Sequence, residues 1–337
     1  MTEPAEGAPP EGAWDQEWVE AFLRCARCSA PKLRRAAGEV RCPSCGHSLP
    51  VTDPGLLTTL PPPPPSLRAD AGARPSPLPA FEGIDSVGDL LSRAFRSRYA
   101  AVLDRQIPPG ARILEAGCLT GELGLFLSVG GRAVVCADRA LAPLRAAAEF
   151  KRRHGLSNCN LLHGSAVDLP CRDETFDLVI CQGALRHSTE PAVALRAILR
   201  MLRPGGYLIC SLYNRAGRMP VSLRRLGSRL FRGTPRDPDR RRPDATEGAG
   251  SSERGAAPAE SRQTIDQVLG WFEQCGIEFL RGVPPVRFGE RWDPSASLFR
   301  RAPRGSRIGR WMTQAGWMLT AGRHGGVFDL IGRKRGG

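Results

Sequence analysis

Residues 112–213 alternate between short apolar runs and longer segments with helical spacing, which limits the fold more than any other feature. The apolar runs are RILEA (112–116), RAVVCAD (132–138), NLLHGS (160–165), FDLVICQG (176–183) and YLICSLY (207–213). Strands that alternate with helices form a mostly parallel sheet covered on both faces. We therefore expect a doubly wound α/β sheet of Rossmann-like type, with a ligand site beyond the carboxyl ends of its strands.

The turn after the first of these runs has the composition of a cofactor loop. In ILEAGCLTGELG (113–124), Glu115 lies near the strand end and Gly117 and Gly121 flank the turn. Small residues there let backbone N–H groups approach a ligand closely. Asp138 ends the second run, where an acidic side chain can accept both hydroxyls of a ribose. Together these residues indicate an adenosine-containing cofactor.

Residues 112–213 resemble a class I S-adenosylmethionine-dependent methyltransferase, of the broad group that includes quinone-biosynthesis C-methyltransferases. The resemblance rests on five ordered motifs: ILEAGCLTGELG, CADRA, GSAVDLP, the FDLVICQGALRH stretch and LRPGGYLICS. The segments SLYNRAGRMP and TIDQVLGWFEQCGIEFLRGVPP also resemble a bacterial branch of this family. The expected activity is transfer of a methyl group from S-adenosylmethionine.

The resemblance implies roles for individual residues. Glu115 and the turn from Gly117 through Cys118 to Gly121 would hold the amino-acid part of S-adenosylmethionine. The remaining cofactor contacts would come from Asp138 at the ribose, Arg139 beside the adenine, Ser165 and Ala166 flanking the adenine ring, and Gln182 with Gly183 near the sulfur.

Two positions depart from the family's pattern. Leu119 replaces the middle glycine of the turn, and Ser165 stands where an aspartate commonly meets the adenine amino group. A lost buried hydrogen bond would weaken binding by about 1–3 kcal/mol. We expect the turn to tolerate Leu119, because the rest of the motif series is intact.

His187, just past the fourth run, is the candidate for a general base or a substrate-orienting group. A helix-start histidine that merely caps or packs is the alternative, and the sequence leaves both open. Tyr213 and Asn214 end the fifth run and are further candidates to face the substrate. Cys181 and Cys210 fall within apolar strands, so a cysteine nucleophile is not expected.

Four cysteines near the N-terminus have the spacing of a metal site. Cys25 and Cys28 form one C-x2-C pair, and Cys42 and Cys45 form a second after thirteen residues. Two such knuckles place four thiolates around one Zn²⁺, and a four-thiolate site has no open position, so its role is structural. With Leu23 before the first pair and LPVTDPG after the second, the segment resembles zinc ribbons that activate methyltransferases or occur fused to them.

Composition divides the rest of the chain. We expect a disordered tail at 1–20, the ribbon at 21–54 and a proline-rich linker at 55–80 that keeps it separate from the cofactor domain. The remaining expected units are that domain at 81–214, a basic helix with a disordered insertion at 215–262, and a C-terminal completion of the sheet at 263–337. In that last unit Trp292, Trp311 and Trp317 are candidates to line the substrate pocket.

The formal charge of +14 lies mostly outside the cofactor domain, since residues 281–337 carry 12 Lys and Arg against three Asp and Glu. An acidic partner is one interpretation, and an arginine-biased composition is another. The expected acceptor is a small or lipid-like molecule; the alternatives are an RNA methyltransferase and a non-catalytic binding protein. The N-terminus lacks a signal-peptide pattern and no apolar run reaches about 18 residues, so we expect a cytoplasmic protein. The oligomeric state stays open.

Overall fold

The computed structural model describes residues 14–52, 55–60, 81, 83–96, 98–218, 261–291, 293, 297–324 and 326–336. Its helices are α1 (Gln16–Phe22), α3 (Val87–Arg96), α4 (Arg98–Gln106), α5 (Glu122–Val129), α6 (Leu141–Arg153), α7 (Pro191–Leu199), α9 (Ile265–Gln274) and α10 (Arg307–His324). Its strands are β1 (Arg34–Ala36), β2 (Glu39–Arg41), β3 (Ser48–Thr52), β4 (Leu56–Thr58), β5 (Arg112–Ala116), β6 (Ala133–Asp138), β7 (Cys159–His163), β8 (Phe176–Cys181), β9 (Leu202–Asn214), β10 (Arg262–Gln263), β11 (Ile277–Val283) and β12 (Val327–Lys334).

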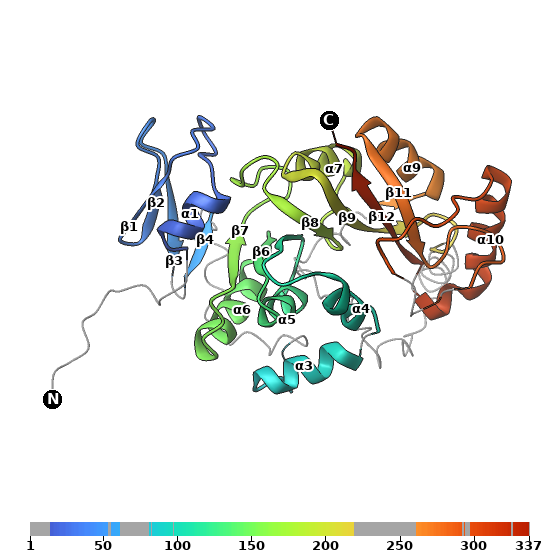
Figure 1. Cartoon of the computed structure of the whole chain (residues 1–337), viewed down its shortest axis with the longest axis horizontal. Helices are drawn as coiled ribbons and strands as arrows, with labels where there is room; N and C mark the ends of the chain where they lie inside the picture. The colour runs from blue at the N-terminus through green and yellow to red at the C-terminus, as the bar shows by residue number, and fades with distance from the viewer. Residues whose placement is uncertain are drawn as a thin grey trace, which may run out of the picture.

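One sheet runs through the whole molecule in the order β1-β2-β3-β4-β7-β6-β5-β8-β9-β12-β11, with β10 paired to β9 (Figure 1). Strands β7, β6, β5, β8 and β9 are parallel, and β12 joins β9 antiparallel before β11 joins β12 antiparallel. The expected doubly wound sheet with an antiparallel end is confirmed. Because β6 and β8 flank β5 on opposite sides, the chain reverses direction across the sheet at β5, and ligands bind at such a switch point.

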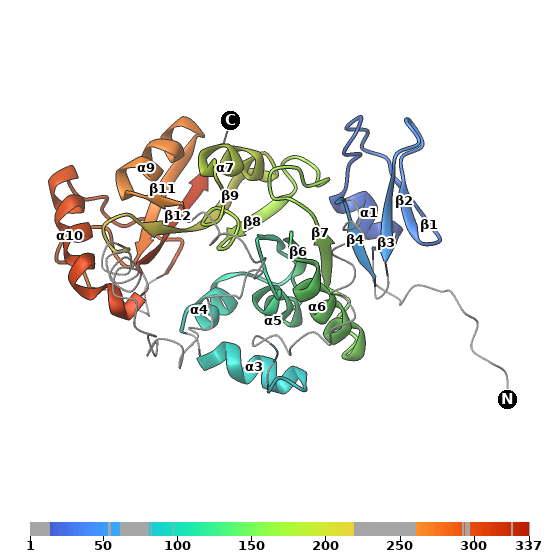
Figure 2. The same cartoon turned by 180° about the vertical axis from the view of Figure 1, so that it is seen from behind.

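Two apolar layers cover the sheet (Figures 1 and 2). One layer packs residues of α4, α5 and α6, such as Leu103, Leu125 and Leu144, against one face. The other packs α1, α7 and α9 against the opposite face, with Phe22, Leu195 and Phe272 among its residues. The parallel strands are buried on both sides, which explains why they read as continuous apolar runs. None of the helices in the described part of the chain is long and apolar enough to cross a membrane.

The N-terminal unit joins the sheet directly, which differs from the expected tail and linker. Residues 16–20, expected in the tail, belong to α1, and Trp14 before it is fully buried and donates from Nε1 to the Leu161 carbonyl at 2.9 Å. Leu56–Thr58, expected in the linker, form β4 and pair in parallel with β7. The ribbon and the cofactor domain therefore share one core, so the expectation that a linker separates them is wrong. The rest of the linker, 61–80, lies outside the described residues.

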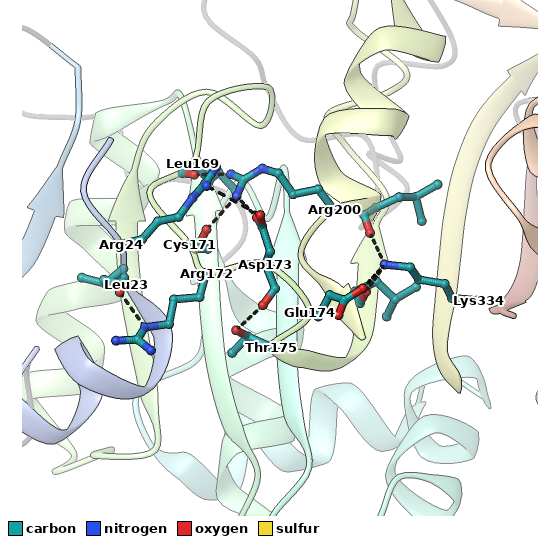
Figure 3. Close-up of polar contacts among 12 residues, drawn as sticks. Leu23, Arg24, Leu169, Cys171, Arg172, Asp173, Glu174, Thr175, Arg200 and Lys334 are labelled. Atoms are coloured by element: carbon teal, nitrogen blue, oxygen red, sulfur yellow. Dashed lines mark hydrogen bonds and ion pairs between the residues drawn. The ribbon is translucent and has the colours of Figure 1, made fainter. Parts of the chain in front are cut away.

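A polar network also fixes the ribbon to the loop between β7 and β8 (Figure 3). Arg172 donates from its backbone N–H to the Phe22 carbonyl at 2.8 Å and from Nε to the Leu23 carbonyl at 2.9 Å. Arg24 and Arg200 both pair with Asp173, and Arg200 also donates to the carbonyls of Leu169 and Cys171 at 2.7 and 2.9 Å. The ribbon thereby holds a loop that continues from the cofactor side of β7.

The C-terminal part completes the sheet as expected, with one helix in the insertion. Thr264 begins α9 with a capping box, in which its hydroxyl and the Gln267 side chain each accept from the other residue's backbone N–H. Helix α10 lies in the second half of the segment between β11 and β12. Most of the basic segment expected at 215–262 lies outside the described residues, from 219 to 260.

Candidate functional site

The loops after β5 and β8 meet at the switch point of the sheet. Gly117 has φ +76°, and a Cβ on it would lie 2.2 Å from the Ala184 backbone nitrogen. A Cβ on Gly183 would lie 2.4 Å from the Gly117 carbonyl oxygen. Only glycine fits either position, since such contacts are far inside van der Waals distance. The expected cofactor turn therefore adjoins the loop that carries Gln182 and Gly183.

Asp138 lies beside this turn, at the end of β6. Its Oδ2 accepts a hydrogen bond from the Leu119 backbone N–H at 2.7 Å, and its Oδ1 accepts from the Ala140 backbone N–H at 2.8 Å. Leu119 has φ +52°, in the left-handed region that favours glycine. Each carboxylate oxygen has about two acceptor positions, so each retains one for a further donor such as a ribose hydroxyl.

Glu115 is buried beneath the turn. Its Oε2 accepts from the Gly124 backbone N–H at 2.9 Å and lies 3.5 Å from the Cys136 Sγ. Burial raises the pKa of this carboxyl to about 7, because few groups replace the water that the charged form loses. Glu115 thus stabilises the first turn of α5 through a hydrogen bond. Its contact with the amino-acid part of a cofactor stays a prediction.

The other turn residues lie close by. Cys118 is buried, which raises its thiol pKa to about 12 and leaves it a neutral thiol. Gly121 precedes α5 with φ +66° and donates its backbone N–H to the Cys118 carbonyl at 2.9 Å. On the β8 side, Gln182 is half-buried and its carbonyl accepts from the Arg186 guanidinium.

The residues expected near the adenine follow β6 and β7. Arg139 is exposed, and Ser165 and Ala166 are half-buried at the start of the loop that docks on the ribbon. The Ser165 carbonyl accepts from the Asp168 backbone N–H at 2.9 Å. The structure brings these residues to the same edge of the sheet as Asp138, while their contact with an adenine ring stays a prediction.

His163 links this edge to the ribbon, and the sequence analysis did not single it out. Its Nε2 lies 3.1 Å from the Arg139 carbonyl oxygen, and its Nδ1 lies 2.7 Å from the Thr58 hydroxyl. A carbonyl only accepts, so Nε2 carries the proton and Nδ1 accepts from Thr58. Burial lowers the pKa of His163 and so favours the neutral ring that this arrangement requires. The signal that reveals His163 is its position at the end of a buried strand.

The expected acceptor side is formed by the ends of β8 and β9. His187 is exposed, and its ring lies edge-on to that of Tyr213 with centroids 6.2 Å apart. The guanidinium carbons of Arg186 and Arg218, both buried, lie 5.5 and 4.1 Å from the Tyr213 ring centroid. These two arginines were missed from the sequence because nothing local marks them as facing the same ring.

Asn214 has a structural role. It is fully buried, donates from Nδ2 to the Gln314 Oε1 at 2.9 Å and accepts from the Gly217 backbone N–H at 3.0 Å. It therefore anchors α10 to the end of β9 and is not directed at a substrate. Cys181 and Cys210 are buried in their strands as expected, and burial raises both thiol pKa values.

The four ribbon cysteines form a closed cluster. Their Sγ atoms all lie within 4.8 Å of one another, with Cys25–Cys45 and Cys28–Cys42 each at 3.6 Å. A tetrahedron with Zn–S bonds of about 2.3 Å has edges of about 3.8 Å, so the cluster fits Zn²⁺. Burial alone would raise the Cys42 thiol pKa, but hydrogen bonds from the backbone N–H groups of Cys45 and Ser44 and from the Cys28 and Cys25 thiols lower it to about 6. His47 contributes only its carbonyl, which accepts from the Cys42 backbone N–H at 2.8 Å.

Known proteins resemble this chain over the same region. A family model described as a methyltransferase domain matches residues 114–210. A demethylmenaquinone methyltransferase from Clavibacter sepedonicus is 31% identical over 172 residues, covering 49% of this chain and 68% of that protein. A ubiquinone biosynthesis O-methyltransferase from Dinoroseobacter shibae is 33% identical over 128 residues, covering 38% of this chain and 51% of that protein.

Solved structures of methyltransferases are also similar to this chain. An S-adenosylmethionine-dependent methyltransferase from Methanosarcina mazei matches 70% of this chain and 98% of its own, at 17% identity and a TM-score of 0.45. Seven further curated quinone-biosynthesis methyltransferases, the Dinoroseobacter protein among them, are matched over only 46% to 61% of their own length. The sheet order, the motif match and the relative covered over two thirds of its length together place the chain in the class I S-adenosylmethionine-dependent methyltransferase family.

Proposed function

We propose that this protein transfers a methyl group from S-adenosylmethionine to a small, lipid-like acceptor. The observation that carries the proposal is the close approach of Gly117 and Gly183 beside Asp138, at the switch point of the sheet. The Asp138 carboxylate keeps acceptor capacity on both oxygens for the ribose hydroxyls. The bound cofactor would supply an electrophilic methyl group on a sulfonium.

The chain's own contribution to such a transfer is mainly positioning. Methyl transfer from a sulfonium is an in-line attack, so holding the two reactants in line provides most of the acceleration. The loops at Gly117 and Gly183 would hold the cofactor, and the ends of β8 and β9 would hold the acceptor. A general base is needed only for an acceptor that must lose a proton, and exposed His187 is our candidate for it.

A lipid-like acceptor is supported by the names of the relatives, which refer to demethylmenaquinone and to ubiquinone biosynthesis. An RNA acceptor, with the ribbon and its arginines as the RNA-binding surface, has less support. Arg24, Arg172 and Arg200 at the ribbon interface are engaged with the chain's own carbonyls and Asp173. These three hold the ribbon in place and are not directed at an external phosphate backbone, whereas Arg27, Arg34 and Arg41 on the ribbon itself are exposed.

The zinc ion, in this proposal, has a structural role. Four thiolates leave no open coordination position, so the metal would stabilise the ribbon and take no part in methyl transfer. The metal would influence the cofactor site only indirectly. Strand β4 adjoins His163, and the loop between β7 and β8 that contacts the ribbon begins near Ser165.

Methyl-labelled S-adenosylmethionine added to a cell extract tests the proposal. We expect label in the organic phase with wild-type protein, less with His187→Asn if that residue is the base, and less with Asp138→Ala at limiting cofactor. Label in an RNase-sensitive fraction would favour the RNA methyltransferase. A folded wild-type protein that binds no cofactor would favour the non-catalytic alternative.

A further inference from the structure

The first half of helix α10, residues 307–314, presents its polar side to the protein and its apolar side to solvent. Arg310, Thr313 and Gln314 are each less than a tenth exposed, whereas Ile308, Trp311 and Met312 are 75%, 68% and 39% exposed. Residues three and four apart lie on one helix face, so the latter three form a single stripe. This is the reverse of an ordinary surface helix, which buries its apolar stripe.

The inward face is held by specific polar contacts. Arg310 donates from Nε to the Asp266 carboxylate at 3.0 Å and from Nη1 to the Gly305 carbonyl at 2.7 Å. The Gln314 Oε1 accepts from the Asn214 side chain at 2.9 Å and from the Ile265 backbone N–H at 3.0 Å. The helix therefore cannot rotate to bury its apolar stripe without breaking buried hydrogen bonds.

Phe288 extends the stripe. It is 54% exposed, and a Cβ on Gly309 would lie 3.9 Å from the Phe288 Cβ. The turn that carries it thus packs against the first turns of α10. We call the four side chains of Phe288, Ile308, Trp311 and Met312 the apolar stripe.

Trp311, expected in the substrate pocket, lies instead in this outward stripe, while Trp317 packs inward on Phe328, with ring centroids 5.8 Å apart. Trp292 lies outside the described residues.

Exposed arginines adjoin the apolar stripe along the chain. Arg287 directly precedes Phe288 and Arg307 directly precedes Ile308, and both are exposed, as are Arg291 and Arg300 in the same stretch of sequence. Over residues 287–312 the sequence has seven arginines against two acidic residues, Glu290 and Asp293. The part of the chain that the structure describes offers no ion-pair partner to Arg287, Arg300 or Arg307, whereas Arg301, Arg304 and Arg310 pair with Glu278, Glu273 and Asp266.

We propose that the apolar stripe and its arginine rim dock the protein on an anionic lipid surface. Aromatic and aliphatic side chains that enter the headgroup boundary, with arginines that meet anionic headgroups, are the features of an interfacial helix. An acidic protein partner would match the arginines, but the uncovered Trp311 and Ile308 favour a surface that takes apolar side chains without a fixed shape. In Figures 1 and 2, α10 lies at the end of the molecule away from the ribbon, so the ribbon leaves this surface clear.

Docking there would bring the acceptor side close to the lipid. Gln314 on the inward face of α10 holds Asn214 at the end of β9, next to Tyr213 and His187. The docking proposal stands on α10 and the turn that carries Phe288, and it does not depend on methyl transfer, because vesicle binding requires no acceptor.

Sedimentation of the full chain with vesicles tests the docking. We expect binding to phosphatidylcholine vesicles that contain phosphatidylglycerol, weak binding to phosphatidylcholine alone, and weaker binding as salt rises. Ile308→Ser with Trp311→Ser should lower partitioning at least about tenfold, and Arg287→Gln or Arg307→Gln about fivefold each. Val193→Ser, a 43% exposed valine on α7, is the matched control and should leave binding unchanged.

Three results would overturn the proposal. The first is no binding to the phosphatidylglycerol vesicles by wild-type protein. The second is binding that survives Ile308→Ser with Trp311→Ser, which would place the contact elsewhere, such as the basic segment expected at 215–262. The third is a dimer in light scattering that the same variant dissociates, which would make the occupant a second copy. Calorimetric binding of S-adenosylhomocysteine to each variant confirms that the cofactor site is intact and keeps a docking failure distinct from a failure of the proposed function.

Discussion

The backbone N–H of Leu119 donates a 2.7 Å hydrogen bond to Oδ2 of Asp138. The residue that departs from the family's turn is thereby attached to the carboxylate expected to bind the ribose. A glycine is favoured at φ +52°, yet this contact uses only the backbone, so the leucine side chain does not prevent it. The relationship explains how the turn keeps its shape without its middle glycine.

Leu119→Gly should change affinity for S-adenosylhomocysteine by less than about threefold in calorimetry. Glycine relieves about 1–2 kcal/mol of left-handed strain and loses about 0.5–1 kcal/mol more in chain entropy, but both act on folding stability and change the affinity only where the turn moves on binding. Gly117→Ala is the contrasting control, because its Cβ would lie 2.2 Å from the Ala184 nitrogen and should abolish binding. A gain above about tenfold in Leu119→Gly would mean that the leucine obstructs the site.

Glu115→Gln should reveal the cost of the buried carboxylate. Its folded-state pKa is about 7 against an ordinary 4.5, so the native state holds a proton that the unfolded state releases. Stability therefore falls as pH rises from about 4.5 to 7, by about 3 kcal/mol at completion.

Denaturant unfolding of both proteins at several pH values measures this cost. The free energy of unfolding of Glu115→Gln relative to wild type should increase by about 3 kcal/mol between pH 4.5 and 8. Taking the difference cancels other titrating groups such as Asp329, whose pKa burial raises to about 6. A difference that is flat with pH would show that Glu115 is solvated.

Much of the fold could be predicted from the sequence, because buried parallel strands are continuous apolar runs and their helices have regular spacing. The docking of the ribbon could not. Strand β4 has only three residues, beside a proline-rich segment, and its pairing partner β7 is about a hundred residues away. The position of α10 was equally hidden, since its contacts depend on Asp266 and Asn214 in other elements.

The sequence could predict those residues of the candidate site that belong to one local motif, and could not predict the contacts between motifs. Gly117, Asp138 and Gln182 lie at strand ends along one edge, as the motif order implied. The contact between the turn and Gly183, the bond from Leu119 to Asp138 and the buried state of Glu115 are tertiary features. They arise where separate strands meet, so no single stretch of sequence specifies them.

Cys42→Ser should remove zinc and destabilise the whole protein. Loss of one of four thiolates opens the ribbon, and the shared core and the pairing of β4 with β7 extend the effect to the cofactor domain. We expect about one zinc per chain in wild-type protein and a loss of at least about 3 kcal/mol of stability in the variant. Cys275→Ser, outside the cluster, is the control for metal content. Independent unfolding of the ribbon, with the main transition unchanged, would contradict the shared core.

Thr58→Val should weaken the link from the ribbon to the cofactor side. The substitution keeps the shape but leaves the His163 Nδ1 without its donor at 2.7 Å. A lost buried hydrogen bond costs about 1–3 kcal/mol of stability. Cofactor affinity should fall as well, because His163 also contacts the carbonyl next to Asp138. Thr175→Val, whose hydroxyl only meets the Asp173 carbonyl, should leave affinity unchanged. Equal cofactor affinity in wild type, Thr58→Val and Thr175→Val would show that the contact between Thr58 and His163 does not influence the cofactor site.

Calorimetric titration of wild type and Asp138→Ala with S-adenosylmethionine tests the central claim most directly, namely that the edge of the sheet beside Asp138 binds the cofactor. The alanine variant loses the acceptor for the ribose hydroxyls and the partner of the Leu119 N–H. We expect measurable binding by wild type and a loss of about 1–3 kcal/mol in the variant. Equal affinity in the two proteins, or no binding by a correctly folded wild type, would contradict the account.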